Sequence, residues 1–133
     1  MKIRVWTLIA FMHTFAFVPD VKAGHDVCQK IHEAAFMDEP GDLTDLIGYG
    51  VNLDCRDIIN QTPLLTAIEG ASLDVVRILL SRGVNINARD EYGDTALAKA
   101  KGKLAFFDVS GGETYSTIYQ NMIDLLENAG AVE

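Results

Sequence analysis

Two segments, RDIINQTPLLTA at 56–67 and RDEYGDTALAKA at 89–100, decide the fold, because the second repeats the pattern of the first. Arginine and aspartate open both segments, and threonine, leucine and alanine recur at matching places within them. The matching residues are 33 positions apart (89 − 56), as are the Gly-Val-Asn stretches at 50–52 and 83–85. Self-similarity with a period of about 20 to 50 residues is typical of solenoid proteins.

Each of the two segments carries the signals of a turn followed by a helix. Thr62 is placed to cap a helix through its hydroxyl, and Pro63 at the next position has the φ angle that a first helical residue needs. In the preceding turns, Asn60 and Gly93 occupy equivalent positions and are the residue types that best tolerate positive φ. The sequence therefore predicts a turn and then a helix in each repeat.

The stretches TPLLTAIEGASLDVVRILLSRGVN (62–85) and NARDEYGDTALAKA (87–100) resemble the ankyrin-repeat family. This resemblance implies an all-α fold, an ankyrin-repeat solenoid of about three helix pairs with short β-hairpin loops. One residue departs from the family pattern: Leu65 stands where the TPLH motif has histidine. We therefore expect the usual hydrogen bonds between repeats through that side chain to be missing.

The repeat period divides the chain into one ankyrin-repeat domain at 24–133. Its predicted parts are a degenerate first helix pair at 24–50, a second repeat at 51–83 and a third repeat at 84–133 with an insertion at about 101–116. The insertion is expected in the turn between the last two helices. Phe106 and Phe107 within it either cap the open end of the stack or protrude toward a partner, and shielding of the terminal repeat favours capping.

The first 23 residues resemble a secretory signal peptide. Lys2 and Arg4 precede an apolar run at 5–18, and Val-Lys-Ala at 21–23 forms a small-residue cleavage site, so cleavage is expected after Ala23. A membrane anchor needs about 20 apolar residues, more than this run contains. The mature form is expected not to be membrane-inserted, and to be periplasmic or secreted.

The charge of the chain limits its partners. The formal net charge is −8, and removal of residues 1–23, with three basic and one acidic side chain, changes it to −10. Such a chain would be repelled by phosphates, which argues against nucleic acid and anionic lipid. A basic protein partner is weakly favoured.

Cys28 and Cys55 are the two cysteines of the chain. An even number in an exported chain is compatible with a disulfide, which would be worth about 3 kcal/mol in the chain-entropy model. The alternative, that Cys55 fills a small buried site where the next repeat has Ala88, stays open.

Enzyme chemistry has little support in the sequence. His25 and His32 lack the spacing of a helical zinc site and are interpreted as exposed or capping residues. We find no nucleophile motif and no phosphate-binding glycine loop. No catalytic, metal or cofactor site is therefore predicted, and a hydrolase with an unrecognised site is the least favoured function.

The family resemblance implies a partner-binding concave face made of hairpin tips and the first helices of each repeat. Ile58 and Ile59 are its most telling members, since two adjacent apolar residues on an exposed tip suit an interface; the alternative is that one or both fold inward. The candidate partner-binding residues are Arg56, Ile58, Ile59, Gln61, Thr66, Glu69, Arg89, Glu91, Tyr92 and Asp94.

As a small exported bacterial ankyrin-repeat protein, the chain is expected to bind one other protein and otherwise to be a monomer. The resemblance implies an immunity protein that neutralises a toxin in the periplasm. The alternative is a scaffold or protective companion of a periplasmic enzyme, such as an oxidative-stress enzyme. Both functions require binding and neither requires catalysis.

Overall fold

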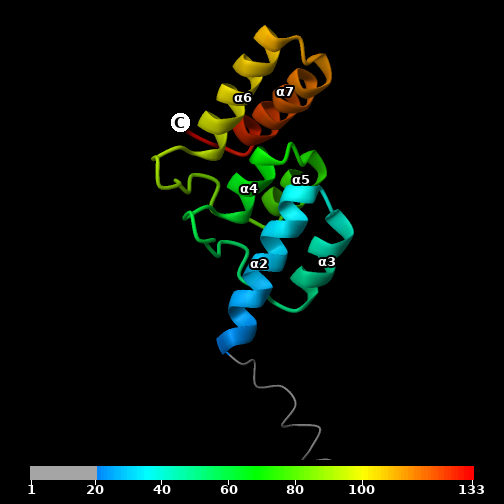
Figure 1. Cartoon of the computed structure of the whole chain (residues 1–133), viewed down its shortest axis with the longest axis vertical. Coiled ribbons are helices and arrows are strands. Elements are labelled where there is room, and N and C mark those ends of the chain that lie inside the picture. The colour runs from blue at the N-terminus through cyan, green and yellow to red at the C-terminus, as the bar shows by residue number, and fades with distance from the viewer. Residues whose placement is uncertain (1–20) are drawn as a thin grey trace, which may run out of the picture.

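A computed structural model of the chain describes residues 21–133, which form six α-helices and no β-strand (Figure 1). The helices form three stacked pairs, as predicted from the repeat period, and consecutive pairs lie side by side. Their bounds are α2 (Val21–Met37), α3 (Pro40–Gly48), α4 (Pro63–Glu69), α5 (Leu73–Ser81), α6 (Ala96–Ser110) and α7 (Glu113–Asn128).

The predicted turn and cap geometry is present in both full repeats. The Thr62 hydroxyl accepts a hydrogen bond from the backbone N–H of Leu65, and Thr95 does the same for Ala98 at 3.3 Å. Asn60 and Gly93 both have positive φ, at 60° and 84°. The hairpin loops therefore form as turns without regular strands among the described residues.

One continuous apolar core runs through the stack. Each helix pair contributes side chains that its neighbour covers, which is how a solenoid buries a surface that a single repeat leaves exposed. Gly70 sits so close to the carbonyl of Phe36 that any side chain there would collide with that backbone. The fully buried large side chains are Tyr119, Ile31, Leu43, Leu64, Leu65, Ile68, Leu79, Met122, Leu126, Val75 and Val76.

The expected position of the insertion in a turn is wrong, because most of it is helical. Helix α6 continues to Ser110 and α7 begins at Glu113, so the turn is reduced to Gly111 and Gly112. Gly111 has φ 79°, which lets the chain reverse directly. The last pair is therefore longer than the other two and extends beyond the stack (Figure 1).

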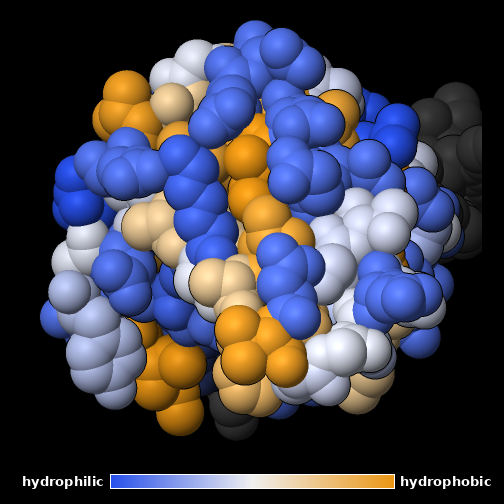
Figure 2. Space-filling model, turned by 90° about the horizontal axis from the view of Figure 1, so that it is seen from above, coloured by the Kyte–Doolittle hydropathy of each residue, from blue (hydrophilic) through white to orange (hydrophobic). Residues whose placement is uncertain are grey.

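The two phenylalanines of the insertion have different environments. Phe107 stacks on Tyr115 and Tyr119, with ring centroids 4.7 and 5.7 Å apart, whereas Phe106 is 65% exposed. Viewed from the α6–α7 end, apolar side chains lie in a band between hydrophilic ones (Figure 2). Phe107 thus shields the end of the core, and Phe106 remains at the surface.

Most of the predicted signal peptide, residues 1–20, lies outside the described residues. Helix α2 begins at Val21, so the expected cut after Ala23 falls within its first turn. None of the helices from α2 to α7 is long and apolar enough to cross a lipid bilayer.

Candidate functional site

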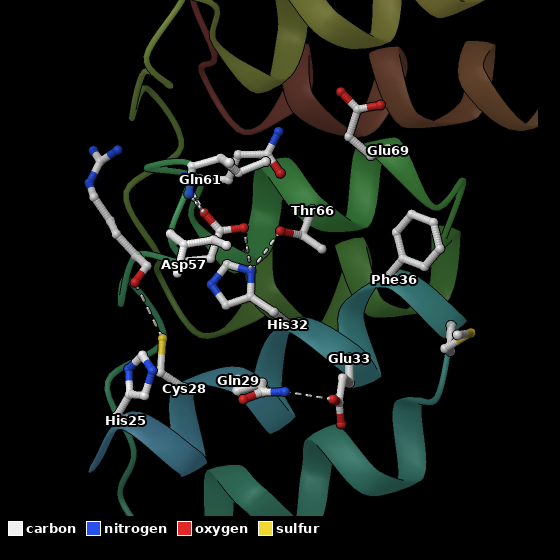
Figure 3. Close-up of a pocket in the computed structure, with 14 residues that line it drawn as sticks. His25, Cys28, Gln29, His32, Glu33, Phe36, Asp57, Gln61, Thr66 and Glu69 are labelled. Carbon is white, nitrogen blue, oxygen red and sulfur yellow. Dashed lines mark hydrogen bonds and ion pairs between the residues drawn. The ribbon is translucent and has the colours of Figure 1, made fainter. Parts of the chain in front are cut away.

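A groove of about 770 Å³ lies between helix α2, the hairpin at 56–61 and helix α4 (Figure 3). Four large apolar side chains line it: Phe36 and Met37 at the end of α2, and Ile58 and Ile59 on the hairpin. All four are exposed to a large degree, Ile58 at 93% and Ile59 at 47%. The alternative in which the isoleucines fold inward is therefore wrong for both.

Carboxylates surround these apolar side chains. Glu33 and Glu69 line the groove from α2 and α4, and Asp57 lines it from the hairpin (Figure 3). Burial raises the pKa of Glu69, but hydrogen bonds and charges from Lys103 and Lys99 lower it by more, so the net shift is downward. Glu69 consequently stays ionised at neutral pH, and Lys99 and Lys103, at 2.9 and 2.8 Å, balance its charge within the protein. The other two carboxylates of the groove are those of Glu33 and Asp57.

The second hairpin adds three exposed members of the predicted set. Glu91, Tyr92 and Asp94 all lie at the surface of the tip. They are not among the residues that line the groove, so the structure extends the candidate face from the groove toward the third repeat.

Two members of the predicted set lie beneath the surface. Gln61 and Thr66 are both buried, and helix α2 of the first pair packs against α4, which carries Thr66. The hydroxyl of Thr66 lies 2.7 Å from Nδ1 of His32, so its hydrogen bond is made within the protein. These two side chains therefore support the groove from below and contribute little contact surface.

The two arginines of the predicted set bind the chain itself. Arg56 donates from Nη1 to the carbonyls of Asn60 and Arg89, at 2.6 and 2.8 Å. Arg89 in turn donates to the carbonyls of Gly93 and Glu133. Arg56 thereby ties the two hairpins together while it also lines the groove, and Arg89 ties the second hairpin to Glu133.

A disulfide joins Cys28 of α2 to Cys55 in the segment that precedes the first hairpin, with Cα atoms 6.1 Å apart. It anchors the base of the hairpin that carries Ile58 and Ile59. Cys28 itself lines the groove, so the crosslink lies at the edge of the candidate surface.

His32 is buried, so its interpretation as an exposed or capping residue is wrong. Nδ1 lies 2.7 Å from the Thr66 hydroxyl and Nε2 lies 3.3 Å from the Cys55 carbonyl, linking the first pair to the second repeat. His32 stands 33 positions before Leu65, so the inter-repeat link is missing at Leu65 but present in the first pair. Moving back by one repeat period of 33 residues from the position of the motif histidine would therefore have identified His32.

Stacked helix pairs with hairpin tips along one side define a solenoid repeat protein. Residues 46–100 match the model for ankyrin repeats in many copies. This stretch of the chain therefore consists of ankyrin repeats.

Three relatives match parts of the chain. It is 36% identical over 56 residues to an ankyrin repeat protein of Acanthamoeba polyphaga mimivirus, covering 42% of this chain and 8% of the relative. It is 39% identical over 59 residues to the B-cell lymphoma 3 protein homolog of Mus musculus, covering 44% and 13%. It is 29% identical over 76 residues to transient receptor potential cation channel subfamily A member 1 of Homo sapiens, covering 56% and 7%.

The chain spans only 7 to 13% of the length of these relatives. The shared part is the repeat scaffold. Ankyrin repeats generally mediate protein–protein interaction and are typically not enzymatic, so the fold is that of a protein-binding module.

Proposed function

We propose that this protein is exported and binds one other protein through the groove lined by Phe36, Met37, Ile58 and Ile59. The observation that carries the proposal is the exposure of Ile58 and Ile59, at 93% and 47%, on a hairpin held rigidly by the disulfide and by Arg56. Exposed apolar side chains on a fixed scaffold suit the centre of an interface.

The partner is a basic protein, and the finer assignment is an immunity protein that neutralises a toxin delivered to the periplasm. The carboxylates of Glu33 and Asp57 at the groove support a basic partner surface, as does the net charge of −8 of the whole chain. Charge complementarity of this kind accelerates association and makes it sensitive to salt. The signal-like segment at 1–23 supports export.

The experiment uses a pair of variants to locate the interface. The double variant Ile58→Ser, Ile59→Ser removes the exposed apolar surface of the groove. Val109→Ser is the matched control, because Val109 is 91% exposed but lies on α6, away from the groove. Wild type and both variants are purified from the native cell envelope, and co-purifying proteins are identified by mass spectrometry.

We expect one stoichiometric partner with wild type and with Val109→Ser, and its loss with the isoleucine double variant. A basic toxic hydrolase as that partner would support the immunity function. An envelope enzyme would instead support the companion function. A partner that the isoleucine variant retains would refute the groove as the binding site.

The kinetics give a second test on the purified complex. If electrostatic steering operates, the association rate falls steeply as salt is raised, whereas the dissociation rate changes less. An association rate that does not depend on salt would contradict a basic partner.

A further inference from the structure

One carboxylate of the groove, that of Asp57, has an oxygen that faces the groove without a bound cation. Oδ1 of Asp57 accepts hydrogen bonds from the backbone N–H groups of Ile59 and Gln61, at 3.0 and 2.8 Å. Oδ2 accepts none from the described residues, and the basic group beside it is Nδ1 of His32, at 3.8 Å. The Asp57 side chain is 24% exposed and lines the groove, so a partner can reach Oδ2 from solvent.

His32 does not supply this cation at neutral pH. Nε2 faces the carbonyl oxygen of Cys55 at 3.3 Å, and since a carbonyl only accepts, Nε2 carries the proton. Nδ1 then accepts from the Thr66 hydroxyl at 2.7 Å (Figure 3). Burial lowers the pKa of His32, outweighing the hydrogen bond to the Cys55 carbonyl and the charge of Asp57, which act to raise it. The ring is therefore neutral, and the negative charge of Asp57 is not compensated by it.

The following repeat shows which group neutralises the equivalent aspartate. Asp90 and Lys99 stand 33 positions after Asp57 and Thr66 (90 − 57 and 99 − 66). Oδ1 of Asp90 accepts from two backbone N–H groups of its hairpin, as Oδ1 of Asp57 does. The Lys99 ammonium lies 2.9 Å from Oδ2 of Asp90. Thr66 is short and uncharged, so the earlier repeat has the aspartate but not its lysine.

The rest of the groove suits a lysine side chain that comes from outside. Glu33 lines it from α2, is exposed and forms no ion pair with the described residues; its hydrogen bond comes from Gln29. Phe36 lies three residues further along the same face of α2, and Ile59 lines the groove from the hairpin. A lysine has an apolar four-carbon stem and a charged end, so it matches both kinds of surface.

We propose that the partner inserts one lysine side chain into the groove, with its ammonium on Oδ2 of Asp57 and its stem against Phe36 and Ile59. This inference rests on the proposed function, because it names the basic group through which the protein partner is recognised. Lysine fits better than arginine, since only one oxygen of Asp57 is available. A guanidinium pairs best with both oxygens of a carboxylate, whereas an ammonium acts as a compact point charge.

The test uses the full processed protein in its disulfide form and a small probe in place of the partner. The probe is the blocked tripeptide acetyl-Leu-Lys-Leu-amide, and two comparison peptides carry norleucine or arginine instead of lysine. Binding is followed by NMR, through the backbone amide signals of Ile59 and Gln61, which donate to Asp57.

Two variants and one control locate the ammonium. Asp57→Asn keeps an acceptor for the hairpin backbone but removes the charge. Thr66→Lys leaves Asp57 intact and supplies from within the lysine that the next repeat has at position 99. Asp108→Asn is the matched control, because Asp108 is an exposed carboxylate on α6 that does not line the groove.

We expect saturable binding of the lysine peptide, weaker binding of the arginine peptide and no binding of the norleucine peptide. Asp57→Asn should weaken binding of the lysine peptide at least about tenfold, as loss of a charge-assisted hydrogen bond does, and Asp108→Asn should leave it unchanged. Thr66→Lys should abolish binding, because its own ammonium then lies at Oδ2.

The proposal is overturned if wild type does not bind the lysine peptide, or if Asp57→Asn binds it as tightly as Asp108→Asn does. Tighter binding of the arginine peptide would overturn the choice of lysine. If the lysine peptide fails to bind while Ile58→Ser, Ile59→Ser still loses a co-purifying protein, the groove remains the binding site and only the lysine inference is refuted. Specific lysine-peptide binding without any co-purifying protein would support the lysine site and contradict the proposed function.

Discussion

The ammonium group of Lys99 on α6 lies 2.9 Å from Oδ2 of Asp90 in the preceding hairpin. The two side chains are 11% and 1% exposed. Lys99 also lies 2.9 Å from Oε1 of Glu69 on α4, so this one cation connects the third repeat to the second. The ion pairs of Lys99 therefore join neighbouring repeats inside the stack.

Removing the Lys99 charge should be strongly destabilising. The substitution Lys99→Met keeps most of the packing but leaves the Asp90 carboxylate buried without its cation, and loss of one partner of a buried pair costs about 3 to 5 kcal/mol. Lys103→Met is the matched control, because Lys103 pairs with the same Glu69 from a more exposed position and should cost under about 1 kcal/mol. Urea unfolding measures both, and equal losses would contradict this role of Lys99.

Acid should weaken the same network. Burial raises the pKa of Asp90, but hydrogen bonds from Lys99 and from the backbone of Asp94 and Tyr92 lower it by more, so it lies below its ordinary value. A carboxylate with a lowered folded pKa contributes stability above its unfolded pKa of about 4, and this contribution is lost as the pH falls through the folded value. The unfolding free energy should therefore decline below about pH 4, and Asp90→Asn should flatten that decline. If the unfolding free energy of Asp90→Asn fell with pH as steeply as that of the wild type, the prediction would be contradicted.

The sequence predicted the parts of the fold that repeat. The caps at Thr62 and Thr95 and the positive φ at Asn60 and Gly93 follow from local residue types that occur twice at one spacing. Those local requirements are the same in every structure that contains this turn and helix.

Features that depend on contacts between distant residues were missed. The apolar residues of α6 do not gather on one face, so periodicity gave no sign that the insertion continues the helix; the stacking of Phe107 on Tyr115 and Tyr119 supports it instead. Burial of Thr66 results from the packing of α2 over α4, which residue type alone does not reveal.

The two phenylalanines of the insertion should differ in their contribution to stability. Phe107→Ala removes the stacked ring at the end of the core and should cost about 2 kcal/mol, roughly half the value for a fully buried phenylalanine. Phe106→Ala should change the unfolding free energy by less than about 0.5 kcal/mol, because that ring faces solvent. Thermal unfolding of both variants checks this, and a larger effect at Phe106 would mean that it contributes to capping.

If the protein is exported, signal-peptide cleavage should give the mature protein a defined N-terminus. Because Val-Lys-Ala at 21–23 has the small residues that signal peptidase accepts, the protein recovered from the cell envelope should begin at Gly24. Intact mass measurement and N-terminal sequencing decide this. A chain that retains residues 1–23 in the envelope fraction would contradict a cleaved signal.

The Cys28–Cys55 disulfide should stabilise the first helix pair against unfolding. It closes a loop with a sequence separation of 27, worth about 3 kcal/mol in the chain-entropy model. Protein purified without reductant should contain no free thiol. Reduction with a phosphine should lower the urea concentration at the unfolding midpoint, by the shift that a loss of about 3 kcal/mol produces. The double variant Cys28→Ser, Cys55→Ser is the control, because reductant should leave its midpoint unchanged. Two free thiols in the untreated protein would show that the crosslink does not form in the cell.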